Sequence, residues 1–313
     1  MTSILLDCDP GHDDMMAIML ASIHPEINLL GITTVAGNQT GDKTFENTRR
    51  ILTLIGETDL PLVRGADKPL FRDLVVAPNI HGSSGLDGAE LPEPRIDGLP
   101  FHAADFIIEM VRDAEKPVTL VPTGPLTNIA MALIKDPSIT KNIERICFMG
   151  GAVYDSNITP AAEFNIYVDP EAARIVLESG VPLTMVGLDV TNKAIINFRH
   201  IREMASWGGK ASSVVAPLMQ FFAEANEKAF GIQGGPIHDA LAVAAVIDPK
   251  VVETLHLNVQ VETCSDLTRG QTLADLYGVT GREPNCDVAL KVDVDRFIKL
   301  MMDSLKELDA RLA

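Results

Sequence analysis

The chain has 313 residues, of which 26 are Lys or Arg and 43 are Asp or Glu, so its formal net charge at pH 7 is −17. Hydrophobic residues make up 46% and charged residues 22%, which is typical of a folded globular protein and excludes a mainly disordered chain. The net negative charge repels nucleic acid and anionic lipid, and the sequence contains no basic patch that would offset this repulsion. No apolar run reaches the roughly 20 residues of a membrane span. We therefore expect neither nucleic acid nor a membrane as a partner.

Short apolar runs alternate with amphipathic segments along the first 190 residues. Strands are predicted at 3–8, 29–35, 60–63, 118–121, 143–149 and 183–186. Helices, with apolar residues at three- and four-residue spacing, are predicted at 14–23, 43–54, 102–114, 126–134 and 170–178. This alternation predicts βαβ units, and hence an α/β protein with a mostly parallel sheet covered by helices on both faces.

The last third of the chain has a different pattern. Residues 199–247 are mainly helical, residues 255–294 return to short strands, and a helix is predicted at 296–312. Because no repeat or low-complexity linker divides the chain, we expect one domain over residues 1–313, with this part as a helical and short-strand elaboration. In open α/β sheets ligands bind beyond the carboxyl ends of the strands, so functional groups are expected in the loops that follow strands.

The cysteines and the N-terminus indicate the compartment. The residues Cys8, Cys147, Cys264 and Cys286 lie far apart, and the N-terminus lacks a basic region followed by an apolar stretch. We expect a cytoplasmic protein with reduced, mostly packed thiols and no disulfide framework.

Four carboxylates lie within eight residues at the end of the first strand and the start of the first helix: Asp7, Asp9, Asp13 and Asp14. Two carboxylates about 4 Å apart repel by roughly 4 kcal/mol at an effective dielectric near 20, so several cannot stay ionised together without a cation. Oxygen ligands without a Cys or His cluster favour Ca²⁺ or Mg²⁺. The alternative, capping of the helix by Asp13 and Asp14, leaves Asp7 and Asp9 unexplained.

Other loops after predicted strands carry polar groups that suit the same crevice. Asn38 follows the second strand, and Thr123 follows the strand at 118–121. Farther on, Asn157, Glu163 and Asn165 offer amide and acid groups suited to sugar hydroxyls. The pair His238 and Asp239 opens an apolar helix, where Asp239 is either an N-cap or a late metal ligand and His238 a titrating group.

With these motifs assembled, the chain resembles the nucleoside hydrolase family, especially the inosine–uridine-preferring type and its pyrimidine ribonucleoside branch. The motifs occur in family order: Asp-Cys-Asp-Pro-Gly-His-Asp-Asp at 7–14, Val-Ala-Gly-Asn-Gln-Thr at 35–40, Asn-Ile-His-Gly at 79–82, Glu-Phe-Asn at 163–165 and His-Asp at 238–239. The resemblance covers essentially the whole chain. It implies a Rossmann-like core, tightly bound Ca²⁺, a homodimer or homotetramer, and hydrolysis of the N-glycosidic bond to ribose and free base.

The resemblance also implies roles for individual residues. The implied calcium ligands are Asp9, Asp14, the Thr123 carbonyl and Asp239. Asp9 would also be the general base. The implied contacts to ribose are Asp13, Asn38, Asn157, Glu163, Asn165 and Asp239, with Asp7 in support. His81 and His238 would act on the leaving base, in a pocket that Asn79 also lines. Asn226 and Phe230 stand where pyrimidine-type relatives tend to have Gln and Tyr, so either another donor assists the leaving base or the preferred base differs from uridine and cytidine. The resemblance implies a preference for uridine and cytidine, with inosine as a further candidate.

Two other functions fit part of the sequence. A haloacid-dehalogenase-type phosphohydrolase also places Asp-x-Asp after its first strand, but its later Lys and acid pair is not evident here. A non-catalytic Ca²⁺-dependent nucleoside- or ribose-binding protein would have less need of Asp9 beside the metal. The other histidines are expected to be surface or capping residues: His12, His24, His102, His200 and His256. Residues 72–88 and 222–234 are candidates for a mobile lid.

Overall fold

The computed structural model describes residues 1–313 and is built on one eight-stranded sheet, in the order β3-β2-β1-β4-β5-β6-β12-β9. All neighbouring strands are parallel except β12 and β9, which are antiparallel. The strands are β1 (Thr2–Cys8), β2 (Ile27–Thr34), β3 (Leu62–Arg64), β4 (Val118–Pro122), β5 (Ile143–Met149), β6 (Leu183–Val186), β9 (Val252–Leu257) and β12 (Cys286–Val292). The predicted mostly parallel α/β sheet is therefore confirmed.

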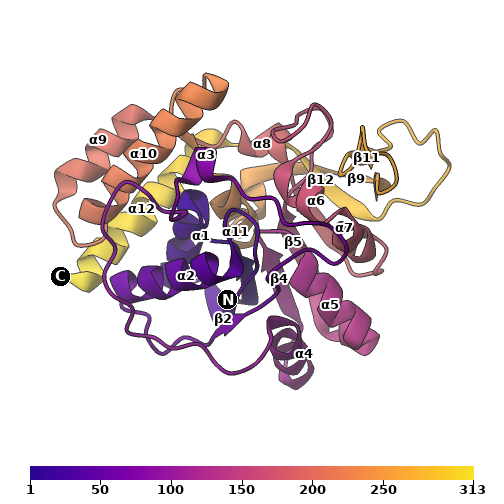
Figure 1. Ribbon diagram of the computed structural model, residues 1–313, viewed down its shortest axis with the longest axis horizontal. Helices are drawn as coiled ribbons and strands as arrows, with labels where there is room; N and C mark the ends of the chain where they lie inside the picture. The colour runs from indigo at the N-terminus through magenta and orange to yellow at the C-terminus, as the bar shows by residue number, and fades with distance from the viewer.

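Helices cover both faces of this sheet (Figure 1). One face carries α1 (His12–Ile23), α2 (Gly41–Ile55), α11 (His238–Ile247) and α12 (Val294–Leu312), with α9 (Phe198–Trp207) and α10 (Ser212–Phe230) packed at one end. The other face carries α4 (Ala103–Asp113), α5 (Thr127–Lys135) and α7 (Pro170–Leu177). Side chains alternate between the two cores: in β1, Ile4 and Leu6 belong to one core and Leu5 to the other.

Several short elements were not predicted individually, because two to six residues are too few to show a periodicity, although β10 and β11 lie within the predicted short-strand region 255–294. They are α3 (Pro78–His81), α6 (Phe164–Val168), α8 (Leu188–Thr191), β7 (Ile195–Ile196), β8 (Gly235–Pro236), β10 (Val259–Val261), β11 (Thr272–Ala274) and 3₁₀ turns at Pro137–Asn142 and Pro249–Val251. Residues 222–230 belong to α10, so most of the segment 222–234 is a helix and not a loop, and its role as a lid stays a prediction. The other suggested lid segment, 72–88, contains α3.

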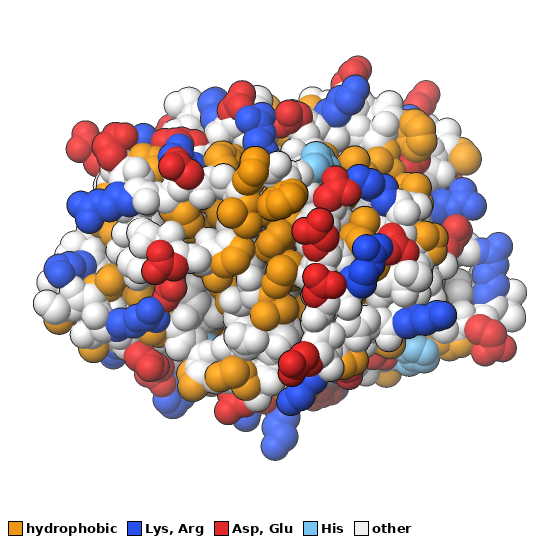
Figure 2. Space-filling view, turned by 90° about the horizontal axis from the view of Figure 1, so that it is seen from below, with side chains coloured by type: hydrophobic (Ala, Val, Ile, Leu, Met, Phe, Trp, Pro, Cys, Tyr) orange, Lys and Arg blue, Asp and Glu red, His pale blue; other side chains and the backbone are white.

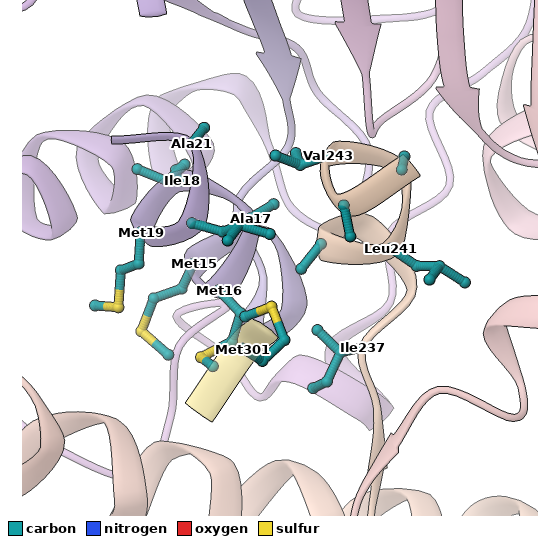
Figure 3. Close-up of a cluster of buried hydrophobic side chains, with 14 of the residues drawn as sticks. Met15, Met16, Ala17, Ile18, Met19, Ala21, Ile237, Leu241, Val243 and Met301 are labelled. Atoms are coloured by element: carbon teal, nitrogen blue, oxygen red, sulfur yellow. The ribbon is translucent and has the colours of Figure 1, made fainter. Parts of the chain in front are cut away.

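The packing of α1 against α11 positions the first turns of both helices. Almost every side chain of α1 after its first turn is buried, and α11 is equally apolar, so both helices lie in the interior. Figure 3 shows α1 and α11 side by side, with Ala17 of α1 and Val243 of α11 on their facing sides and Leu241 pointing away from α1. The acids at the start of each helix, which include Asp13 and Asp239, are thereby brought together.

Charged side chains of both signs lie on the surface, and most of the thiols are packed, as expected. Figure 2 shows acidic and basic side chains interspersed over one face, with a strip of hydrophobic side chains and no continuous basic area. None of the helices combines the length and hydropathy needed to cross a bilayer. All four cysteines are free thiols, and only Cys264 is exposed.

Candidate active site

A pocket opens at the carboxyl edge of the sheet, where β1 lies between β2 and β4 and the order of the strands reverses. The empty space within it, including the open mouth, is about 680 Å³. Every residue expected to contact substrate lines this pocket: Asp13, Asn38, Asn79, His81, Asn157, Glu163, Asn165, Asn226, Phe230, His238 and Asp239. Of the expected metal ligands, Thr123 and Asp239 line the pocket, whereas Asp9 and Asp14 do not. All four are almost completely buried.

Buried carboxylates gather in and beneath this pocket. Oxygens of Asp13, Asp14 and Asp239 lie within 4.8 Å of one another. Burial raises the pKa of Asp13 to about 7, and burial together with neighbouring acids raises the pKa values of Asp9 and Asp239 well above their usual range. No Lys or Arg lines the pocket to balance this charge.

Two oxygens in this acid cluster have no hydrogen-bond partner, namely Asp9 Oδ1 and Asp13 Oδ1. A buried, unpaired carboxylate oxygen is costly unless a cation contacts it. The donor set is entirely oxygen, as a hard divalent ion prefers. The residues therefore fit a Ca²⁺-type ion, and the structure adds Asp13 to the carboxylates able to contact it.

Glycines hold the Asp9 carboxylate in place from two sides. A Cβ on Gly37 would lie 2.1 Å from Asp9 Oδ2, and one on Gly124 would lie 2.6 Å from Asp9 Oδ1. Asp9 Oδ2 also accepts a hydrogen bond of 2.7 Å from the backbone N–H of Asn38. The loops after β2 and β4 thus approach Asp9 so closely that only glycine fits.

Asp14 both caps α1 and belongs to the acid cluster, so the two interpretations of it from sequence are compatible. Its Oδ2 accepts from the Gly11 N–H at 3.0 Å, and its Oδ1 accepts from the Thr123 hydroxyl at 2.8 Å. The Thr123 carbonyl accepts from Asn165 Nδ2 at 2.7 Å, which occupies one of its two lone pairs. Asp7 lies deeper, where its Oδ1 accepts from Thr33 and Asn128.

The groups suited to sugar hydroxyls are held by the backbone of α6 and the loop after β5. Glu163 caps α6: Oε1 accepts from Asn165 N at 2.9 Å, and Oε2 accepts from Ile166 N at 3.1 Å and from Gly151 N at 3.0 Å. Burial raises the pKa of Glu163 to about 7. Asn157 Oδ1 accepts from Phe164 N, which leaves its NH₂ group as a donor.

The prediction that His12 is a surface or capping residue is wrong, because its side chain is buried and caps no helix. Its ring is fully buried and stacks on Phe222, with centroids 5.2 Å apart. Its Nδ1 lies 3.2 Å from His81 Nδ1, and its Nε2 lies 2.9 Å from the Asp87 carbonyl. The signal available in the sequence was the apolar character of α1 on all sides, which buries a His at its start.

The pocket residues proposed to contact the leaving base are His238, Asn226 and Phe230. His238 Nδ1 lies 2.7 Å from the Thr191 hydroxyl, and burial lowers the pKa of His238 to about 4. Asn226 Nδ2 donates to the Phe222 carbonyl, which leaves Asn226 Oδ1 as an acceptor. Phe230 is half exposed at the rim. The lining residues that the sequence did not indicate are Ala77, Ile80, Met149, Ile158, Phe164 and Phe222.

The other four histidines lie away from the pocket, as expected. His102 accepts from Ala104 N at the start of α4, and His200 accepts from Asn197 N at the start of α9. His24 is the C-terminal cap residue of α1, and His256 contacts Asp287 at the surface.

Comparison with known proteins gives matches over nearly the whole chain. The family model described as "Inosine-uridine preferring nucleoside hydrolase" matches residues 4–299. The pyrimidine-specific ribonucleoside hydrolase RihA of Escherichia coli O1:K1 is 47% identical over 304 residues, which cover 97% of this chain and 98% of that protein. A purine-preferring ribonucleoside hydrolase from Gardnerella vaginalis has a similar structure, with a TM-score of 0.93 and 35% identity over 98% of this chain and 99% of its own. An inosine-guanosine nucleoside hydrolase has a TM-score of 0.89 at 31% identity over 98% and 99% of the two chains.

Proposed function

The chain belongs to the inosine-uridine preferring nucleoside hydrolase family, and from this premise we propose that it hydrolyses pyrimidine ribonucleosides to ribose and free base. The observation that supports this most directly is the unpaired Asp9 Oδ1 beneath a pocket lined by amides and acids suited to ribose. The relatives at 47% identity are described as pyrimidine-specific, which favours uridine and cytidine over inosine.

We propose that the cofactor is Ca²⁺, held by Asp9, Asp14, Asp239 and the second lone pair of the Thr123 carbonyl, with Asp13 beside them. When bound, this ion would supply fixed positive charge that keeps the acids ionised and makes a nearby water more acidic. The all-oxygen donor set and the burial of the carboxylates support this assignment.

Asp9 is proposed as the general base. Its Oδ1 has no protein partner, while its Oδ2 is fixed by the Asn38 N–H, so the carboxylate is oriented and one oxygen remains able to take a proton. In hydrolysis, the water oxygen forms a bond to C1′ as the C1′–N bond breaks. Asp9 takes the proton that this water loses.

The acids around the sugar favour the transition state over the neutral substrate. Cleavage of a glycosidic bond develops positive charge on the ribose ring, and buried carboxylates stabilise that charge. Asp13, Asp239 and Glu163 all line the pocket. Glu163 is held by three backbone N–H groups, so it needs little reorganisation during the reaction.

Nucleosides should be strongly preferred over nucleotides, because the pocket has acids and no Lys or Arg to receive a phosphate. We expect kcat/KM for uridine 5′-monophosphate to be about a hundredfold or more below that for uridine, a difference of about 2.7 kcal/mol. Parallel assays of released ribose and ribose 5-phosphate measure this ratio. Equal kcat/KM values for the two substrates would contradict the proposal that this acidic pocket excludes a phosphate.

The proposed function is tested by measuring ribose release from uridine, cytidine, inosine and adenosine. We expect uridine and cytidine to give the highest kcat/KM values. No turnover of any nucleoside, with binding retained in calorimetry, would favour the binding-protein alternative. Hydrolysis of phosphomonoesters alone would favour the phosphohydrolase alternative.

We also propose that residues 1–313 form one domain and that the chain assembles as a homodimer or homotetramer. The single sheet, with a core on each face, supports the first of these proposals. Light scattering of the purified protein would measure the number of subunits.

A further inference from the structure

A buried hydroxyl contacts one nitrogen of the pocket histidine His238. Thr191, the last residue of α8, is completely buried, and its Oγ1 lies 2.7 Å from His238 Nδ1. Neither side chain has another hydrogen-bond partner in the protein. His238, the first residue of α11, is only partly buried and lines the pocket.

This contact has a preferred direction. A threonine hydroxyl has one hydrogen to donate, and Thr191 has no acceptor other than His238 Nδ1. If Nδ1 carried the proton and donated to Oγ1, the hydroxyl hydrogen would be buried without an acceptor, which is unfavourable. Donation by Thr191 therefore favours an unprotonated Nδ1 and leaves the ring proton on Nε2.

We propose that Thr191 is a positioning residue that holds His238 as the Nε2–H tautomer, so that a neutral imidazole presents a hydrogen-bond donor to the leaving base. This inference rests on the proposed nucleoside hydrolase function. It adds to that function the residue that orients His238, the side chain that contacts the leaving base. His238 then acts through a hydrogen bond and does not transfer its proton.

The chemistry balances without a proton from the histidine. When the C1′–N bond breaks, its electron pair passes to the base, and the Nε2–H bond stabilises the negative charge that develops there. The base takes its proton from solvent as it leaves, while Asp9 holds the proton lost by the attacking water. Phe230, at the rim of the same pocket, has no hydroxyl that could take this role.

The kinetic test uses two substitutions at Thr191, one that removes the hydroxyl and one that keeps it. Thr191→Val keeps the shape and removes the donor, and we expect kcat for uridine to fall about tenfold with little change in KM. Thr191→Ser should restore most of the native kcat. The matched control is Thr48→Val in α2, which removes another buried hydroxyl, bonded to the Thr44 carbonyl and remote from the pocket. It should leave kcat unchanged.

A second substrate separates leaving-group assistance from general damage. The leaving group of 4-nitrophenyl β-ribofuranoside is stable as an anion, so its hydrolysis should be nearly equal in native protein and Thr191→Val. In a His238→Ala background, Thr191→Val should cause no further loss with uridine, because the hydroxyl acts through the imidazole. Equal losses with both substrates, or additive losses with His238→Ala, would overturn the inference.

The tautomer can also be observed directly. In protein labelled with ¹⁵N-histidine, the signals that disappear in His238→Ala should show an unprotonated Nδ1 and a protonated Nε2. A protonated Nδ1 would overturn the inference even if the enzyme is active. If the native chain cleaves neither uridine nor the nitrophenyl riboside, the proposed function itself fails, and the role of Thr191 fails with it.

Discussion

Replacing Asp9 with Asn is expected to lower kcat for uridine by about a thousandfold or more. The amide cannot accept a proton, and general-base catalysis alone contributes about 10²- to 10⁴-fold. The substitution also removes an anionic ligand from the proposed Ca²⁺ site. The shape of the side chain and its contact with the Asn38 N–H can be kept, so the loss should lie mainly in kcat.

The control for Asp9→Asn is Asp169→Asn. Asp169 is also completely buried, but it caps α7 and accepts from Thr127 and Leu70, away from the pocket. We expect Asp169→Asn to cost about 1–2 kcal/mol of stability and to leave kcat near the native value. In chelator at pH 8, Asp9→Asn should unfold at the native temperature or above, because one repelling acid has gone. An Asp9→Asn protein with more than about a tenth of native kcat would contradict the general-base assignment.

Removal of Ca²⁺ by a chelator is expected to abolish turnover and to lower the melting temperature, by an amount that grows with pH. Burial and mutual repulsion raise the pKa values of the clustered acids above their unfolded value of 3.8, that of Asp13 to about 7. At a pH between 3.8 and the raised pKa of each acid, the metal-free folded state holds a proton that the unfolded chain has released. Its free energy of unfolding therefore falls as pH rises toward and through 7.

The proposed Ca²⁺ should have the opposite dependence, because it would bind the ionised carboxylates and its affinity would rise as they lose protons. Melting temperatures measured with Ca²⁺ and with chelator, from about pH 5 to pH 8, should therefore diverge as pH rises. Asp239→Asn should reduce this divergence, since it removes one of the acids with a raised pKa. Melting curves that coincide at every pH would rule out a structural cation at this site.

The sequence predicted the layered fold well where elements are long and regular. The predicted strand at 3–8 and helix at 14–23 correspond to β1 and α1, because the alternation of Ile4, Leu5 and Leu6 and the spacing of apolar residues in α1 are local signals. The short helices α3, α6 and α8 were missed, although each carries a residue that matters for the site. Their positions depend on contacts with distant segments, such as the Asn165 amide with the Thr123 carbonyl.

The sequence by itself determined the chemistry of the site: an oxygen-only acid cluster after the first strand, amides suited to a sugar, and the family motifs in order. Only the tertiary structure decided which of these groups meet. Packing of α1 on α11 brings Asp239 to Asp13, burial removes His12 from the surface, and a contact across 47 residues pairs Thr191 with His238. The physical reason is that residue types and local periodicity are properties of a segment, whereas burial and hydrogen-bond partners depend on how distant segments pack.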